Sequence, residues 1–223
     1  MTLDFTLEKY KELCFALLDS NMRIMTFRSY LEETPKSDFV ILRHDIDRIP
    51  FNALRMAELE NQLGIESTYY FRSVKGFWGS FKPEIIRSIH ELGHEVGYHY
   101  EVLSKSKGNY AAALKLFESE LSEFRKICDI VTISMHGSPL SAYDNRDLWK
   151  LYDFKQFGIL GEAYLSVEDI YYFSESGRTW SPRGKLRDVL KYANVPINSY
   201  PLVNNTDDLI ALIRSRKENK LYL

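Results

Sequence analysis

An uninterrupted apolar run at residues 39–42 leads directly into the polar segment Arg-His-Asp-Ile-Asp at residues 43–47. A strand without polar alternation is typically buried on both faces, as in a parallel sheet covered by helices. If the segment stays extended, Asp45 and Asp47 point to the same side, because side chains alternate with a period of two. Two carboxylates a few ångströms apart repel each other unless a cation or a shared proton lies between them. The segment therefore predicts a metal ion and a general base at the end of a buried strand.

The rest of the chain repeats a strand-and-helix pattern. The joint Leu-Gly-x-Glu occurs at residues 63–66 and 92–95, and its glycines, Gly64 and Gly93, stand where left-handed backbone ends a helix. No linker divides the sequence, so we expect one domain spanning residues 1–223. Successive βα units predict a parallel sheet, either closed into a barrel or open and doubly wound. We expect strands at 39–42, 67–71, 96–100, 130–135, 170–173 and 220–223, and helices at 5–20, 51–63, 83–92, 110–128 and 206–216, the last capped by residues 206–208.

Polar side chains follow four of these predicted strands. The carboxyl ends of parallel strands lie at one edge of a sheet, where α/β proteins place their catalytic groups. Residues far apart in the sequence are therefore expected to converge. His90, inside a predicted helix, and His94, at the opposite end of a strand, are expected to be structural instead. The residues expected to converge are Asp45, Asp47, Arg72, His99, Glu101 and His136.

The residue types at this edge indicate metal chemistry. One carboxylate with two imidazoles suits a catalytic zinc or a similar divalent ion and leaves positions open for water and substrate. We therefore predict Asp47, His99 and His136 as ligands, with Asp45 as the general base that takes a proton from water. The predicted reaction is hydrolysis of an amide or an ester. No GxSxG, GxxxxGK or GxGxxG motif in the sequence offers another mechanism.

An aromatic and arginine-bearing segment occupies residues 171–183. Flat aromatic faces pack against pyranose rings, and arginine binds phosphate or carboxylate groups, so the segment is predicted to contact a sugar. The alternative is a solvated loop with aromatic anchors, and the same two interpretations apply to Phe77 and Trp78. The residues predicted to bind substrate are Arg72, Glu101, Glu175, Trp180 and Arg183.

Charge and cysteine content exclude several classes of function. The 29 basic and 31 acidic residues nearly cancel, so no nucleic-acid-binding surface is expected. Cys14 and Cys128 are far apart, which argues against a disulfide framework. The N-terminus lacks the basic and apolar segments of a secretory signal, and no apolar run is long enough to span a membrane. We therefore expect a cytoplasmic globular protein without a membrane span.

Two segments of the sequence resemble the polysaccharide deacetylase family, which is carbohydrate esterase family 4 or the NodB-homology domain. They are residues 43–47 and the run Gly-His-Glu-Val-Gly-Tyr-His at residues 93–99. The family's first motif pairs a base aspartate with a metal-binding aspartate, and its second motif ends in a metal-binding histidine. The resemblance implies those roles for Asp45, Asp47 and His99. It also implies a distorted (β/α)7 barrel.

The sequence departs from the family pattern at three places. The family's second metal histidine would fall at Leu103, and we expect His136 rather than Glu101 to replace it, because His136 ends the next strand. The arginine-bearing third motif is not recognisable around His136. The family's late Leu-x-His motif, whose histidine is a general acid, would follow residues 220–223, where the sequence stops. Three explanations stay open: a truncation after residue 223, an acid supplied by another residue, or a protein that does not catalyse the family reaction.

The leading hypothesis is a Zn²⁺-dependent hydrolase that removes an N-acetyl or O-acetyl group from a carbohydrate. The resemblance places it in a branch associated with surface-polysaccharide biosynthesis, with the N-terminal helix, residues 5–20, packed on the barrel. A carbohydrate is thus the expected partner. The alternative is a non-catalytic carbohydrate-binding protein of the same fold, which the missing motif histidines favour. Hydrolysis of a C–N bond outside sugars is a third hypothesis.

Overall fold

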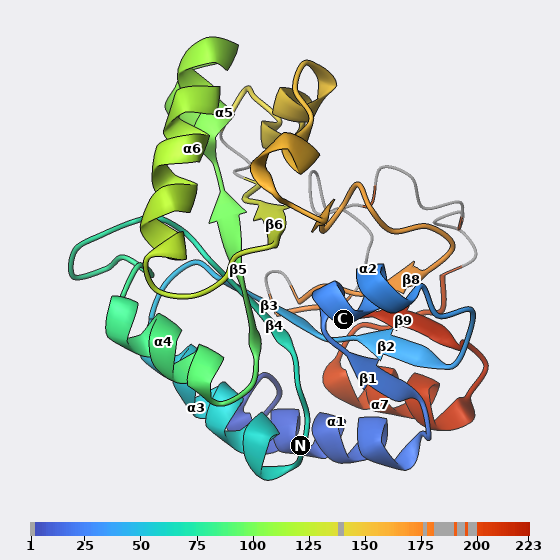
Figure 1. Cartoon of the computed structure of the whole chain (residues 1–223). Coiled ribbons are helices and arrows are strands. Elements are labelled where there is room, and N and C mark those ends of the chain that lie inside the picture. The colour runs from blue at the N-terminus through green and yellow to red at the C-terminus, as the bar shows by residue number, and fades with distance from the viewer. Residues whose placement is uncertain (1–2, 138–140, 176–177, 181–189, 191–194, 196–199) are drawn as a thin grey trace.

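The computed structural model describes residues 3–137, 141–175, 178–180, 190, 195 and 200–223, and shows helices alternating with strands (Figure 1). The α-helices are α1 (Leu7–Asp19), α2 (Phe27–Glu33), α3 (Pro50–Gln62), α4 (Pro83–Glu91), α5 (Val102–Lys105), α6 (Tyr110–Arg125) and α7 (Thr206–Ser215), and the 3-10 helices are η1 (Asn145–Lys150) and η2 (Phe154–Phe157). The strands are β1 (Arg23–Met25), β2 (Phe39–Ile41), β3 (Arg43–Ile46), β4 (Thr68–Phe71), β5 (Glu95–Tyr100), β6 (Thr132–Met135), β7 (Gly161–Glu162), β8 (Tyr171–Tyr172) and β9 (Lys220–Tyr222).

The strands form two sheets in which every pairing between described residues is parallel. The first sheet has the order β1-β2-β9-β8, and the second has the order β3-β4-β5-β6-β7. Helices follow most strands of the second sheet, as parallel connections require. The α/β class predicted from the sequence is confirmed.

The strand expected at residues 39–42 is longer than predicted and is divided between the two sheets. β2 belongs to the first sheet and β3 to the second, and Leu42 joins them. The Leu42 N–H donates to the Met25 carbonyl (3.1 Å), while its carbonyl accepts from the Thr68 N–H (2.9 Å). The chain therefore changes hydrogen-bond partners at this residue without leaving the extended conformation. The two sheets meet there.

The N-terminal helix packs beside the last helix of the chain. In Figure 1, α1 and α7 lie next to each other below the first sheet. Leu13 and Leu17 of α1 belong to a buried cluster that includes Val40 of β2 and Leu209 of α7. The Thr6 side chain begins α1 by accepting a hydrogen bond from the N–H of residue 9 (3.1 Å). The predicted N-terminal helix is thus confirmed.

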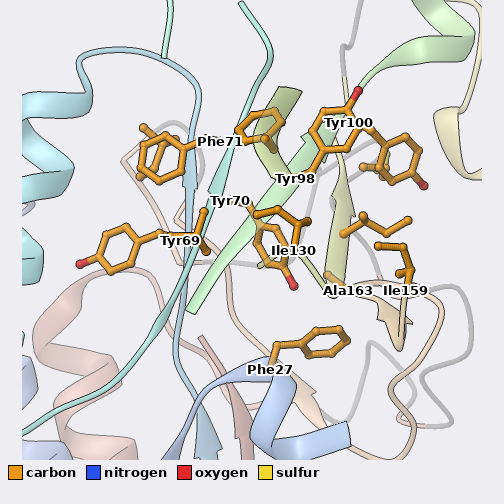
Figure 2. Packing of buried hydrophobic residues seen from close by; sticks show 14 of the residues in the cluster. Phe27, Tyr69, Tyr70, Phe71, Tyr98, Tyr100, Ile130, Ile159 and Ala163 are labelled. Carbon is orange, nitrogen blue, oxygen red and sulfur yellow. The ribbon is translucent and has the colours of Figure 1, made fainter. Parts of the chain in front are cut away.

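Aromatic side chains fill the core between the second sheet and its helices. Tyr98 of β5 lies 5.5 Å from Phe117 and 5.1 Å from Phe124 of α6, measured between ring centroids. Figure 2 shows Tyr98 among neighbouring buried residues, with Tyr69 on another part of the sheet. Fully burying one such ring stabilises the fold by roughly 1.5–3 kcal/mol. This packing holds β4, β5 and β6 in place below the site described next.

The short helix α2 closes the amino-terminal end of the second sheet. The Phe27 N–H donates to Thr68 Oγ1 (2.8 Å), and the Arg28 N–H donates to Glu95 Oε2 (2.8 Å). Two of the N–H groups that a helix start leaves unpaired are thereby satisfied by β4 and β5. Burial raises the pKa of the Glu95 carboxyl, although Thr132 and the Arg28 N–H act in the opposite direction. The sequence patterns did not predict α2, because it is too short for a clear helical period.

The predicted helix ends are largely confirmed. Gly64 and Gly93 have φ angles of 72° and 93°, so both are left-handed residues just beyond helix ends. The predicted cap of the last helix is wrong by one residue. Asn205 is the N-cap, and its side chain accepts from a backbone N–H of the first turn. Thr206 Oγ1 instead accepts from Trp180 Nε1 (3.0 Å).

Two further observations bear on composition. Cys14 and Cys128 are buried free thiols. Within the described ranges, no helix combines the length and the apolar character needed to cross a membrane.

A buried carboxylate, Glu60 of α3, ties α1 to the sheet. Its Oε1 lies 2.7 Å from His44 Nε2 and accepts from the Tyr10 hydroxyl, while its Oε2 accepts from Ser67 Oγ (2.5 Å) and from the Tyr69 hydroxyl (2.8 Å). Burial alone would raise the pKa of Glu60, but His44 and these hydrogen bonds lower it below its ordinary value. Glu60 is therefore a buried anion whose partners come from three separate elements.

Replacing Glu60 should destabilise the protein strongly. Glu60→Gln replaces a buried carboxylate that accepts hydrogen bonds from three hydroxyls with a neutral amide, and we expect a loss of roughly 1.5–3 kcal/mol in the free energy of unfolding at neutral pH. Because folding lowers the pKa of Glu60, this contribution is complete above its unfolded value of 4.5 and is lost as the pH falls through the folded value. Denaturant unfolding of both proteins between neutral and acid pH measures it.

Glu58→Gln is the matched control, because Glu58 is an exposed residue of the same helix. It should change the free energy of unfolding by no more than about 0.5 kcal/mol. Equal stability of Glu60→Gln and Glu58→Gln at neutral pH would contradict the role given to Glu60.

Candidate metal centre

The carboxyl-terminal edge of the second sheet brings Asp47, His99 and His136 together. Asp47 follows β3, His99 lies in β5 and His136 follows β6. Asp47 Oδ1 lies 3.7 Å from His99 Nε2 and 3.3 Å from His136 Nε2. One ligand atom from each residue lies within 4.8 Å of the other two. The structure thus assembles the three residues that the sequence predicted as metal ligands.

The hydrogen bonding of His99 leaves one ring nitrogen available to a metal. His99 is buried, and its Nδ1 lies 3.0 Å from the carbonyl oxygen of Ser134 on the neighbouring strand. Because a carbonyl only accepts, Nδ1 carries the proton and Nε2 presents a lone pair. Burial lowers the pKa of His99, although Asp45 and Asp47 act in the opposite direction, so the ring is neutral at physiological pH. A metal-binding histidine typically has this arrangement.

The His99 lone pair faces two carboxylates. Nε2 lies 3.7 Å from Asp47 Oδ1 and 3.9 Å from Asp45 Oδ2. Three electron-rich atoms in this arrangement repel one another unless a cation lies between them. A divalent metal ion therefore fits the donor set that the residues present.

His136 presents Nε2 to Asp47 and Nδ1 to Glu101. The His136 Nδ1 lies 3.1 Å from Glu101 Oε2. Burial alone would lower the pKa of His136, but the contacts with Asp47 and Glu101 raise it to about 9. In the metal-free protein His136 is therefore protonated on both nitrogens at neutral pH. A bound metal replaces the proton on Nε2.

Glu101 lies behind His136. Arg72 Nη2 donates to Glu101 Oε2 (2.7 Å), and Arg72 Nη1 lies 3.9 Å from Asp47 Oδ1. Burial alone would raise the pKa of Glu101, but the close contact with His136 and the hydrogen bond from Arg72 lower it to about 2. A carboxylate on the far nitrogen of a ligating histidine fixes the orientation of its ring. The geometry favours His136 as the third ligand and Glu101 as the residue that orients it.

Asp45, the predicted base, lies beside the three ligand residues and is held by Arg43. Arg43 Nη2 donates to Asp45 Oδ2 (3.1 Å). The sequence reasoning gave Arg43 no role. One signal could have found the contact: the two residues are two positions apart in a strand and so share a face.

A cavity of about 470 Å³ opens beside Asp45. Its lining includes Asp45, Tyr172, Glu175 and Trp180, together with residues at the start of α1 and α3. The Trp180 indole is fixed by its hydrogen bond to Thr206 (3.0 Å). Glu175 and Trp180, two residues predicted to bind substrate, thus line the same cavity as the predicted base, although they are more than a hundred positions away in the sequence.

The other residues predicted to bind substrate do not line this cavity. Arg72 and Glu101 pair with each other at the metal centre. Arg183 lies outside the described residues. Phe77 and Trp78, for which the sequence left two interpretations open, are 85% and 74% exposed and contact each other edge to face.

Comparison with known proteins adds no family to this description, because no protein-family model matches the chain and no curated protein matches its sequence. The class of site therefore rests on the geometry. The fold and the site define an α/β protein with a candidate centre for a divalent metal and a second carboxylate beside it.

Metal affinity should separate the roles of His136 and Glu101. His136→Ala removes a ligand, so we expect zinc affinity to fall by more than about 100-fold, whereas Glu101→Gln removes an orienting partner and should cost about 10- to 100-fold. Competition with a chromophoric chelator measures both. His90→Ala, which changes an exposed histidine on α4, is the control and should leave affinity unchanged. Unchanged affinity in His136→Ala with loss in Glu101→Gln would make Glu101 the ligand.

Proposed function

We propose that the protein is a metal-dependent hydrolase that removes an acetyl group from a carbohydrate, most directly from an N-acetylated sugar of a surface-polysaccharide precursor in the cytoplasm. The observation that carries this proposal is the position of Asp45. Its Oδ2 lies 3.9 Å from His99 Nε2, although Asp45 is not one of the three ligand residues. A second carboxylate in this position can act as the general base of a hydrolysis, because the attacking water must lose a proton.

The donor set supports Zn²⁺ as the metal. Asp47, His99 and His136 would hold it, and one carboxylate with two imidazoles is a donor set that zinc takes in hydrolases. When bound, the ion would polarise the acetyl carbonyl and lower the pKa of a water molecule. Asp45 would take the proton from that water, because its carboxylate faces the free Nε2 of His99, whereas Glu101 lies at Nδ1 of His136, the nitrogen turned away from Asp47.

The cavity supports a carbohydrate as the substrate. Trp180 offers an aromatic surface of the kind that packs against a pyranose ring, and Glu175 offers a carboxylate that accepts hydrogen bonds from hydroxyl groups. A volume of about 470 Å³ lies in the usual range for small-molecule sites. Asp47, His99 and His136 do not line this cavity. Asp45 lines it and lies 3.9 Å from His99, so Asp45 is the residue at which the cavity adjoins the metal centre.

Strand pairing supports the barrel and the family that the sequence suggested. β8 pairs with β9 and β9 with β2, the chain passes into β3, and β3 to β7 pair in order. Among the described residues β7 and β8 do not pair with each other. Arg43 connects them, because it donates both to Tyr164, just after β7, and to Tyr172 of β8. A distorted (β/α)7 barrel accounts for this connectivity. Together with the motifs at residues 43–47 and 93–99, it supports a divergent polysaccharide deacetylase.

One observation favours a second candidate function, that of a carbohydrate-binding protein without catalysis. Leu103, at the position of the family's second metal histidine, is a buried residue of α5 and offers no ligand atom. Such a protein would bind sugars in the cavity and release no acetate. The two functions therefore differ in one measurable outcome, which is turnover by the zinc-loaded protein.

Substitution of the two aspartates should separate base from ligand. Asp45→Asn should keep zinc bound while turnover falls by about 10²–10⁴-fold, the usual worth of a general base. Asp47→Asn should lose zinc, because a neutral amide is a poor ligand for this ion. Zinc content is measured by atomic absorption, and turnover by acetate release from a panel of N-acetylated amino sugars.

Asp19→Asn, at the exposed end of α1, is the control and should match the wild type in both measurements. Loss of zinc from Asp45→Asn with retention by Asp47→Asn would reverse the two assignments. A zinc-loaded wild type that binds the sugars and releases no acetate would establish the binding function in place of the hydrolase.

A further inference from the structure

A buried guanidinium at the side of the site is held by three tyrosines. Arg43 Nη1 donates to the Tyr222 hydroxyl (2.9 Å), and its Nη2 donates to the hydroxyls of Tyr164 and Tyr172 (2.8 Å each). Asp45 Oδ2 also accepts from Nη2 (3.1 Å), so the two hydrogens of Nη2 are shared among three acceptors. Arg43 therefore connects the end of β7, β8 and β9 to the proposed base.

The tyrosines fix the guanidinium more firmly than the single carboxylate could. The guanidinium carbon lies 4.6 Å from the ring centroid of Tyr164, 5.0 Å from that of Tyr222 and 5.4 Å from that of Tyr172, so the rings also contribute cation–π attraction. Burying a charged group is costly unless its donors have acceptors, and the three hydroxyls accept from Nη1 and Nη2. The Arg43 side chain is 4% exposed, so its position is set by the protein and not by solvent.

Asp45 depends on this arrangement. Its side chain is 25% exposed, and Arg43 is the only described residue that donates a hydrogen bond to it. His99, the other near neighbour, presents a lone pair and would repel the carboxylate in the absence of a metal. The direction in which the carboxylate points is therefore set by Arg43, and the direction of Arg43 is set by the tyrosines.

We propose that Tyr164, Tyr172 and Tyr222 act through Arg43 as positioning residues for Asp45. This inference rests on the proposed function, in which Asp45 is the base. Tyr164 and Tyr222 are absent from the lining of the cavity, so their hydroxyls act on catalysis without touching the sugar. A purely structural role would make the same hydroxyls matter for stability alone.

Single-hydroxyl variants of the full chain test this proposal. Tyr222→Phe and Tyr164→Phe each remove one acceptor and keep the ring. Tyr110→Phe is the matched control, because Tyr110 is a partly buried tyrosine that begins α6 and packs on the core cluster of Tyr98 and Phe117. The probe is 4-nitrophenyl acetate with zinc-loaded protein, and zinc affinity and Tm are measured on the same samples.

A displaced base lowers kcat without a change in the ligands. We expect kcat to fall by about 10- to 100-fold in both variants, since a shift of about 1 Å can cost 10²-fold, while KM and zinc affinity stay within about threefold of the wild type. Tyr110→Phe should keep the wild-type kcat. A lower Tm with unchanged kcat in Tyr222→Phe and Tyr164→Phe would overturn the positioning role.

Crystal structures of the zinc-loaded variants give a readout that does not depend on turnover. The Asp45 carboxylate should rotate away from its wild-type position in both variants and stay in place in Tyr110→Phe. An unmoved Asp45 would overturn the proposal. A zinc-loaded wild type that hydrolyses the probe no faster than Asp45→Asn would instead reject the hydrolase function, and the structures would still decide whether the tyrosines position Asp45.

Discussion

Parallel pairing of β3, β4, β5 and β6 is the constraint on which the site depends. Because these strands run in one direction, their carboxyl ends share an edge, and the ligand residues meet there. The pairing also sets the chemistry of one ligand, since His99 lies opposite Ser134 and binds its carbonyl. A shift of one residue in the pairing register of these strands would turn Asp45 and His99 toward the helices. The sheet therefore fixes both the positions of the donors and the tautomer of His99.

The segment at residues 43–47 serves both faces of the sheet. Arg43 and Asp45 point toward the candidate metal centre, and His44 points the other way to the buried Glu60. The two least exposed polar side chains of this segment both have polar partners: Arg43 contacts Asp45 and three tyrosine hydroxyls, and His44 contacts Glu60. Alternation along one strand thus explains how so polar a segment can directly continue the apolar run of β2. The same alternation links the stability of the fold to the geometry of the site.

The sequence predicted those features that have a local signal. Asp47, His99 and His136 each end or follow a buried strand, so a rule about strand ends was enough to group them. The contacts of Arg43 with Tyr164 and Tyr222 could not be predicted this way, because they join residues more than a hundred positions apart. The division of the first strand at Leu42 also escaped prediction, since a change of hydrogen-bond partner leaves no mark on an apolar run.

The central claim is that Asp47, His99 and His136 hold a divalent metal beside Asp45. Crystals soaked in zinc and measured at the zinc absorption edge test it most directly. We expect one anomalous peak at this edge of the sheet, within about 2.0–2.2 Å of Asp47 Oδ1 and of both Nε2 atoms. The absence of a peak there at saturating zinc, or a peak whose ligands leave out two of these three residues, would contradict the account.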